Sequence, residues 1–189
     1  MKVVALNGST RGKAGNTNIA LELMRDELKA EGIETEIIIL SDMSLNPCKA
    51  CMGCKGKNKC VQVDSINEIY QKMLAADGII IGSPTYFSNV TSRIQMLIER
   101  TGYLSRLNND AFKGKIGAAV AVARRAGANV VYSAINYFFG LSQMPIATSS
   151  YWNVLFGREP GEIKKDTEGI QTLKNLVKNM AKLMKKTRT

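Results

Sequence analysis

The sequence contains no histidine and no long hydrophobic run, and all of its cysteines lie in one short stretch. Without histidine in any of the 189 positions, Ser-His-Asp and Cys-His catalysis and histidine-ligated metal sites are excluded. No apolar run is long enough to span a bilayer. Residues 1–7 show no signal-peptide pattern. We therefore expect a cytoplasmic protein without membrane contact, in which thiols favour metals over disulfides.

Acidic side chains are also in short supply. The chain has 16 Asp and Glu against 26 Lys and Arg, which gives a net charge of +10. Aromatic residues make up only 6% of the chain and do not alternate with the basic residues, as a base-stacking platform requires. Nucleic acid is thus a disfavoured partner, whereas an acidic protein or an anionic cofactor fits the charge. Most of the C-terminal lysines are expected to form a solvated face.

The four cysteines follow the pattern C-x2-C-x2-C-x5-C and are Cys48, Cys51, Cys54 and Cys60. Two-residue gaps let successive thiolates surround one centre, and four thiolates favour zinc or an iron–sulfur cluster. Zinc patterns usually separate two C-x2-C pairs by roughly 15–20 residues, whereas closely spaced cysteines are typical of ferredoxin-type cluster binding. One [4Fe–4S] cluster in loop 47–61 is the simplest interpretation. A zinc site and a pair of disulfides remain alternatives.

Apolar runs alternate with helical patterns along the chain, and the length favours one domain, residues 1–189. The expected strands are residues 2–7, 33–40, 78–82, 115–123 and 145–149. Ser65 and Glu68 predict a capping box at the start of the helix that follows the cysteines, and residues 151–166 are expected to form a long loop. Five alternations predict a doubly wound α/β fold with a parallel sheet covered on both faces.

Two unusual loops follow the first and third expected strands. With strand order 2-1-3-4-5, the order reverses between these strands, and ligands bind at the carboxyl edge there. Residues 8–18 offer small side chains, backbone N–H groups and a helix N-terminus, which together make a phosphate cradle. Ser9 and Thr17 can donate hydroxyl hydrogen bonds, and Arg11 can bind a phosphate bidentately. The alternative is an ordinary loop that caps its helix.

The second loop, residues 83–89, contains Pro84, which restricts the turn, followed by Tyr86 and Phe87. It would suit a flat aromatic ring system lying against backbone amides. Packing of the two aromatic side chains at the base of the loop is the alternative.

Together these residues resemble the iron–sulfur flavoproteins of the NAD(P)H-dependent FMN reductase branch of the flavodoxin-like fold. Segment 8–17 is similar to the family's FMN phosphate loop, segment 83–87 to its isoalloxazine loop, and the cysteines to its compact cluster motif. The resemblance implies bound FMN, a [4Fe–4S] cluster and a homodimer or homotetramer. The flavin-binding residues that it implies are Ser9, Thr10, Arg11, Asn16, Thr17, Asn18, Pro84, Thr85, Tyr86, Phe87 and Gly127. The segment 124–129 departs from the glycine-rich loop of the reductases, which argues against direct use of nicotinamide.

The leading hypothesis is an electron-transfer flavoprotein. An acidic carrier such as ferredoxin would deliver electrons through the cluster to FMN, and FMN would reduce a small acceptor, with the resemblance implying dioxygen or peroxide. No catalytic side chain is expected, because the flavin carries the chemistry. Basic residues that would steer the carrier are Lys49, Lys55, Lys57 and Lys59. The alternatives are an NAD(P)H-dependent FMN or quinone reductase without a cluster, and a basic binding module with a zinc site.

Overall fold

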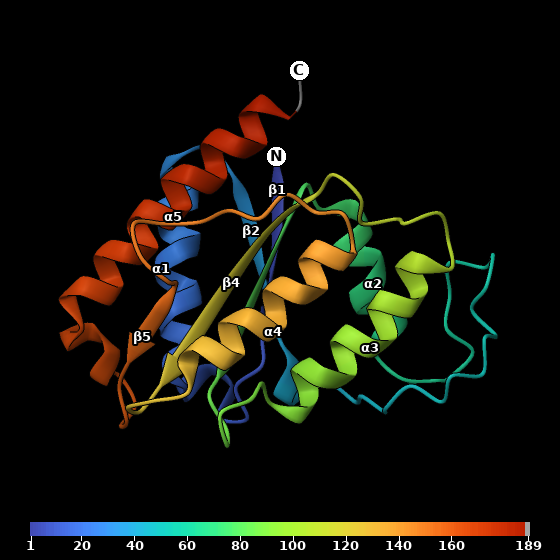
Figure 1. The fold of residues 1–189 in the computed structure, drawn as a ribbon, viewed down its shortest axis with the longest axis horizontal. Coiled ribbons are helices and arrows are strands. Elements are labelled where there is room, and N and C mark those ends of the chain that lie inside the picture. Colours follow the sequence, from blue (N-terminus) through green and yellow to red (C-terminus); the bar gives the residue numbers. More distant parts are fainter. Residues whose placement is uncertain (188–189) are drawn as a thin grey trace.

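The computed structural model describes residues 1–187 and contains one five-stranded parallel sheet (Figure 1). The strand order is β2-β1-β3-β4-β5, as expected. The strands are β1 (Lys2–Asn7), β2 (Glu34–Ile39), β3 (Gly78–Pro84), β4 (Ile116–Ala123) and β5 (Val154–Phe156). The helices are α1 (Asn16–Ala30), α2 (Ile66–Ala75), α3 (Ser92–Arg106), α4 (Ala128–Leu141) and α5 (Thr167–Lys186). Short 3-10 helices are η1 (Gly12–Ala14), η2 (Leu40–Asp42) and η3 (Glu162–Lys165).

Helices cover both faces of the sheet, so each strand buries side chains on two sides. One core lies between the sheet and α1 and α5, and the other lies between the sheet and α2, α3 and α4. Successive strand residues point to opposite faces: Val3 and Ala5 belong to the first core, and Val4 and Leu6 to the second. This explains why the strands read as continuous apolar runs.

The position expected for the fifth strand is wrong. The strand is Val154–Phe156, inside the segment that was expected to be a loop. Residues 145–149 instead make one isolated bridge, between Ile146 and Gly117 at the start of β4. Chain segment 148–149 then leaves the sheet, since the Thr148 carbonyl and the Ser149 hydroxyl bond to α5. The chain returns to the edge of β4 at Asn153, whose carbonyl accepts from the Ala121 N–H at 3.0 Å.

The expected capping box is also wrong, although α2 begins where it was expected. Ser65 makes no side-chain bond to its own helix, and its hydroxyl accepts from the Ser44 N–H at 3.2 Å. Asp64 takes over the role, because its carboxylate accepts from the Ile66 N–H at 3.2 Å.

Residues 43–65, between η2 and α2, form a long loop without a helix or strand. This segment is called the cysteine loop below. It contains all four cysteines and lies beside α3, at the right of Figure 1. The insertion after the second strand is therefore confirmed. Among residues 1–187, none of the helices has the length and apolar character needed to span a membrane.

Candidate functional site

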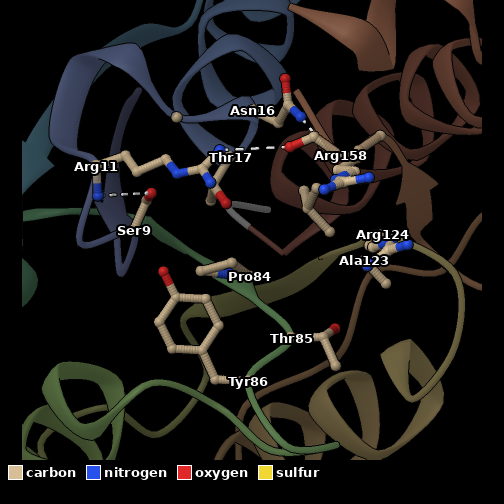
Figure 2. A pocket seen from close by; sticks show the side chains of 13 residues that line it. Ser9, Arg11, Asn16, Thr17, Pro84, Thr85, Tyr86, Ala123, Arg124 and Arg158 are labelled. Atoms are coloured by element: carbon tan, nitrogen blue, oxygen red, sulfur yellow. Dashed lines mark hydrogen bonds between the residues drawn. The ribbon is translucent and has the colours of Figure 1, made fainter. Parts of the chain in front are cut away.

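A cavity of about 260 Å³ opens at the carboxyl edge of the sheet, where the loops after β1, β3, β4 and β5 meet (Figure 2). This edge between β1 and β3 is where the reversal of strand order predicts a ligand. The lining residues are Ser9, Arg11, Gly15, Asn16, Thr17, Pro84, Thr85, Tyr86, Val122, Ala123, Arg124, Gly157 and Arg158.

Asn7, at the end of β1, organises the loop that precedes α1. Its buried side chain accepts from the Ser9 N–H at 2.9 Å and donates to the Gly12 carbonyl at 3.3 Å and to the Asn18 side chain at 3.1 Å. The loop is compact, because a Cβ on Gly15 would lie 2.3 Å from the Ser9 hydroxyl. Asn18 supports the loop through its hydrogen bond with Asn7 and is not among the residues that line the cavity.

Two threonine hydroxyls at the cavity are buried and have no hydrogen-bond partner among the residues that the structure describes. They are the Oγ1 atoms of Thr17, at the start of α1, and Thr85, after β3. A buried polar atom without a hydrogen bond is costly and calls for a specific explanation. A bound ligand that accepts from both hydroxyls would supply it, so this cavity fits a flavin phosphate on one side and a polar ring on the other.

Three arginines, Arg11, Arg124 and Arg158, surround the cavity. Figure 2 shows Arg11 reaching from the first loop toward Arg158, whose carbonyl accepts from Nη1 at 3.3 Å. The N-terminus of α1 lies at the same place and adds partial positive charge. This combination suits a doubly charged phosphate.

Asn16 joins the first loop to the segment after β5. Its Nδ2 donates to the carbonyls of Gly157 and Glu159 at 3.2 and 2.9 Å, and its Oδ1 accepts from the Gly161 N–H at 2.8 Å. All of these bonds are internal to the protein. Asn16 thus lines the cavity, and its side chain connects two segments of the cavity wall to each other.

The β3 loop closes the opposite side of the cavity. The hydroxyls of Tyr86 and Thr10 are 2.7 Å apart and link the two loops. Phe87 is fully exposed and has a φ of 50°, so it neither lines the cavity nor packs in the core. Gly127 has a φ of 83° and packs closely against Ser88, outside the cavity.

The structure thus brings seven of the predicted flavin-binding residues to the cavity lining, but Thr10, Asn18, Phe87 and Gly127 are outside it. Sequence reasoning missed Arg124 and Arg158. Both follow strands at the same carboxyl edge, so the loops after β4 and β5 were the available signal. For Arg158, that signal was hidden by the wrong position of the fifth strand.

All four cysteines line a second, smaller pocket together with Arg100 and residues of α3. None of them forms a disulfide. Within residues 1–187, no three potential ligands are arranged to hold a single metal ion. The sulfurs share a pocket without converging on one point.

The thiols interact electrostatically. Burial raises the pKa of the Cys54 thiol, and the neighbouring thiolates of Cys60, Cys48 and Cys51 raise it further. A cationic centre stabilises thiolates that lie this close together, and an iron–sulfur cluster supplies one. The donor set and its electrostatics fit such a cluster. The Arg100 guanidinium contributes one N–H to the Cys60 sulfur at 3.0 Å.

Residues 1–158 match the model of the NADPH-dependent FMN reductase family. They include the cysteine loop and the cavity at the carboxyl edge of the sheet, which is called the flavin-type cavity below. The chain belongs to this family. It is a flavin-dependent oxidoreductase, and FMN is its flavin.

Two curated proteins similar to this chain are named iron–sulfur flavoproteins. This chain is 38% identical to an iron–sulfur flavoprotein of Methanocaldococcus jannaschii, over 98% of both chains. It is 32% identical to an iron–sulfur flavoprotein of Methanosarcina thermophila, over 97% of this chain and 95% of the relative. A solved flavodoxin from the domain Archaea superimposes with a TM-score of 0.65 at 18% identity, covering 98% and 99% of the two chains. That likeness establishes the flavodoxin-like fold.

Proposed function

We propose that this protein is an electron-transfer flavoprotein with a [4Fe–4S] cluster held by Cys48, Cys51, Cys54 and Cys60. An acidic carrier of the ferredoxin type would supply electrons, and a small molecule such as dioxygen or peroxide would accept them. The observation that carries the proposal is the pocket that all four free cysteines share, on a lysine-rich loop apart from the flavin-type cavity. The names of the relatives support it.

Flavin and cluster together supply the redox chemistry when bound, since the cluster exchanges single electrons and FMN can pair two of them. Two carrier molecules per turnover provide those two electrons. Dioxygen takes them with two protons from solvent and becomes hydrogen peroxide. Peroxide takes two electrons and two protons and becomes two water molecules.

The residues that line the cavity bind and orient the flavin. Ser9, Thr17 and Arg11 are proposed to hold the phosphate, helped by the N-terminus of α1. Thr85 and Tyr86 are proposed to face the ring. The lining contains no carboxylate, cysteine or lysine side chain, which supports the proposal that the flavin carries the reaction.

The exposed face of the cysteine loop suits an acidic carrier. Met52, Val61 and Val63 are exposed apolar residues in this segment. The basic residues on the same segment are also exposed, and they are Lys49, Lys55, Lys57 and Lys59. Exposed apolar side chains on the same segment as exposed lysines suit a transient interface, in which charge guides the encounter.

A second copy of the chain is the proposed partner for two other apolar surfaces. One consists of Tyr151, Trp152 and Phe156 near β5, and the other of Val130, Tyr137 and Leu141, which project from α4 at helical spacing. Large exposed apolar patches mark interaction sites. We propose a homodimer or homotetramer, working in a reducing compartment such as the cytoplasm, where the thiols stay available as ligands.

A reductase that takes its electrons directly from NAD(P)H is the second candidate. An open hollow of about 460 Å³ adjoins the flavin-type cavity and shares Arg124 and Arg158 with it. Lys165, Glu162 and Asp166 also line this hollow, which therefore has three cationic and two acidic side chains. The excess of positive charge is the feature that would suit a second phosphate-bearing molecule. In this second candidate the protein holds no cluster.

Anaerobically purified protein separates the two candidates. The proposal expects about four iron and four sulfide per chain, as the cluster formula requires, together with bound FMN. In stopped-flow mixing, reduced ferredoxin should bleach the flavin absorbance, and NADPH should do so far more slowly. Stoichiometric zinc without sulfide would contradict the cluster. Rapid reduction by NADPH with no response to ferredoxin would favour the direct reductase.

A further inference from the structure

Arg100, in the middle of α3, is a buried cation. Its side chain is among the largest fully buried ones in the protein, with the residue 2% exposed. Burying a charge costs free energy unless the charge is paired and hydrogen-bonded. Replacing a buried ion pair by apolar residues of similar size often leaves a protein equally stable or makes it more stable. The position therefore raises the question of what the guanidinium does.

Asp64 fixes the orientation of this guanidinium. Its Oδ2 accepts from Nη1 at 2.8 Å and its Oδ1 from Nη2 at 3.1 Å, and both side chains are essentially inaccessible. The Arg100 Nη1 also donates to the Asn46 carbonyl at 2.7 Å, and Asp64 accepts from the Asn46 N–H at 3.0 Å. Because Asn46 precedes the first cysteine and Asp64 follows the last, Arg100 holds the two ends of the loop together.

One of the remaining donors of the guanidinium bonds to a cysteine. Nη2 donates to the Cys60 sulfur at 3.0 Å, and Arg100 lines the pocket that the four cysteines share. Its Nε is buried and has no acceptor among the residues that the structure describes. A loop clamp alone requires neither the bond to sulfur nor a donor left without an acceptor beside the thiols.

We propose that Arg100 is a positioning residue that raises the reduction potential of the cluster through its hydrogen bond to the Cys60 sulfur. The inference rests on the cluster of the proposed function. Net charge and hydrogen bonds to the sulfurs set the potential of such clusters. An added electron increases the negative charge on sulfur, so an N–H directed at Cys60 stabilises the reduced form more than the oxidised form. Asp64 balances the cationic charge and keeps the donor aimed.

Arg93 provides a matched control on the same helix. Its Nη1 donates to the carbonyls of Leu40 and Met43 at 2.9 and 3.1 Å, so it also anchors the start of the loop. No cysteine is among its hydrogen-bond partners. Arg93→Met should therefore loosen the anchoring of the loop without removing a bond to sulfur.

The experiment is an EPR-monitored redox titration of anaerobic protein, with iron and sulfide assayed in every variant. Arg100→Met should make the reduced cluster at least tenfold harder to form, a fall of about 59 mV for one electron. The potential of FMN in the same molecules should stay unchanged, and so should the cluster potential of Arg93→Met. Arg100→Lys keeps the charge but loses the fork that serves both Asp64 and sulfur, so its potential should also fall.

Arg100→Lys carries the test if Arg100→Met does not fold. Full cluster content with the parent's potential in an Arg100 variant would overturn the proposal. So would an equal fall in Arg93→Met. Loss of the cluster from both Arg100 variants with FMN retained would also overturn it, because Arg100 would then be only an anchor. Absence of iron and sulfide from the parent protein would instead refute the proposed function before any variant is compared.

Discussion

The flavin-type cavity and the cysteine loop are built in different ways. The cavity is formed where strands end and α1 begins, so its residues are placed by the sheet and by backbone hydrogen bonds. Residues 43–65 have no helix or strand and expose the apolar side chains of Met52, Val61 and Val63. The loop is held mainly by side chains of its neighbours: Asn67 bonds to the backbone of Cys60, and Asn108 to the Cys54 carbonyl.

The two sites should differ in how far they depend on their cofactors for their shape. A cradle of backbone groups at the edge of a packed sheet exists before the flavin arrives, because the core that shapes it is already folded. A loop with few buried apolar residues gains much of its order from the centre that its thiolates bind, since metal binding and local folding are coupled. The two sites should therefore respond very differently to loss of their ligands.

The largest effect is expected from Cys60→Ser. Removing one thiolate should abolish or convert the cluster, while FMN stays bound because its cavity shares no residue with the cysteine pocket. Iron, sulfide and flavin assays on anaerobic protein measure both. Ferredoxin should no longer reduce the flavin, whereas dithionite still should. Loss of FMN in proportion to the cluster would show that the two sites are not independent.

Arg11→Ala should produce the next largest effect, confined to the other site. Its loss should weaken FMN binding by about 1.5–3 kcal/mol, the range for hydrogen bonds to charged groups. Riboflavin lacks the phosphate and should bind the parent weakly, with little change in the variant. Titration of apoprotein followed by flavin fluorescence gives both affinities. Equal binding of FMN and riboflavin by the parent would contradict the phosphate cradle.

The alternation of strands and helices could be predicted because it depends on local signals, whereas the strand order was taken from the flavodoxin-like fold that the chain resembles. Buried strands alternate with amphipathic helices, and the reversal point then marks the loops after β1 and β3. The fifth strand could not be placed this way. Val154–Phe156 has strand-favouring residues, but the strand is only three residues long, so it gives a weak local signal. Its pairing with β4 is decided by tertiary packing, while α5 draws Thr148 and Ser149 away from the sheet.

Contacts between distant segments are the part that sequence reasoning could not supply. Arg158 meets Arg11 from 147 positions away, and Arg100 meets Asp64 from 36 positions away. A buried arginine in an otherwise ordinary helix has no local signature. The cysteine spacing, in contrast, was informative because two-residue gaps limit how far apart the thiols can lie.

Acid should loosen the cysteine loop before it affects the flavin-type cavity. Burial raises the pKa of Asp64, but hydrogen bonds from Arg100, Ile66 and Asn46 outweigh it and hold the pKa below its ordinary value. A depressed pKa contributes stability that is complete above the unfolded value of about 3.9 and is lost as pH falls through the folded value. Hydrogen exchange of apoprotein should show constant protection near Asp64 from about pH 5 to 8 and loss in stronger acid.

Asp64→Asn is the control for that measurement. The variant should show weaker protection of the loop at neutral pH and no further loss in the acid range that titrates Asp64. In the loop that precedes α1, the Ser9 N–H bonds to the Asn7 side chain and the Arg11 N–H to the Ser9 hydroxyl. Neither acceptor titrates in acid, so these amides at the flavin-type cavity should keep their protection through the same range. Parallel loss in both regions would contradict the separation of the two sites.

The smallest effect is expected from Thr85→Val, which removes one hydroxyl and nearly preserves the shape of the side chain. That hydroxyl is buried without a partner among residues 1–187, so a flavin ring that accepts from it gains a neutral hydrogen bond worth about 0.5–1.5 kcal/mol. FMN and riboflavin should weaken equally, in contrast to Arg11→Ala, because both carry the ring. The apoprotein should keep or slightly gain stability in urea unfolding, since an unsatisfied buried hydroxyl has been removed. A destabilised apoprotein with unchanged flavin affinity would mean that Thr85 serves the fold and not the ligand.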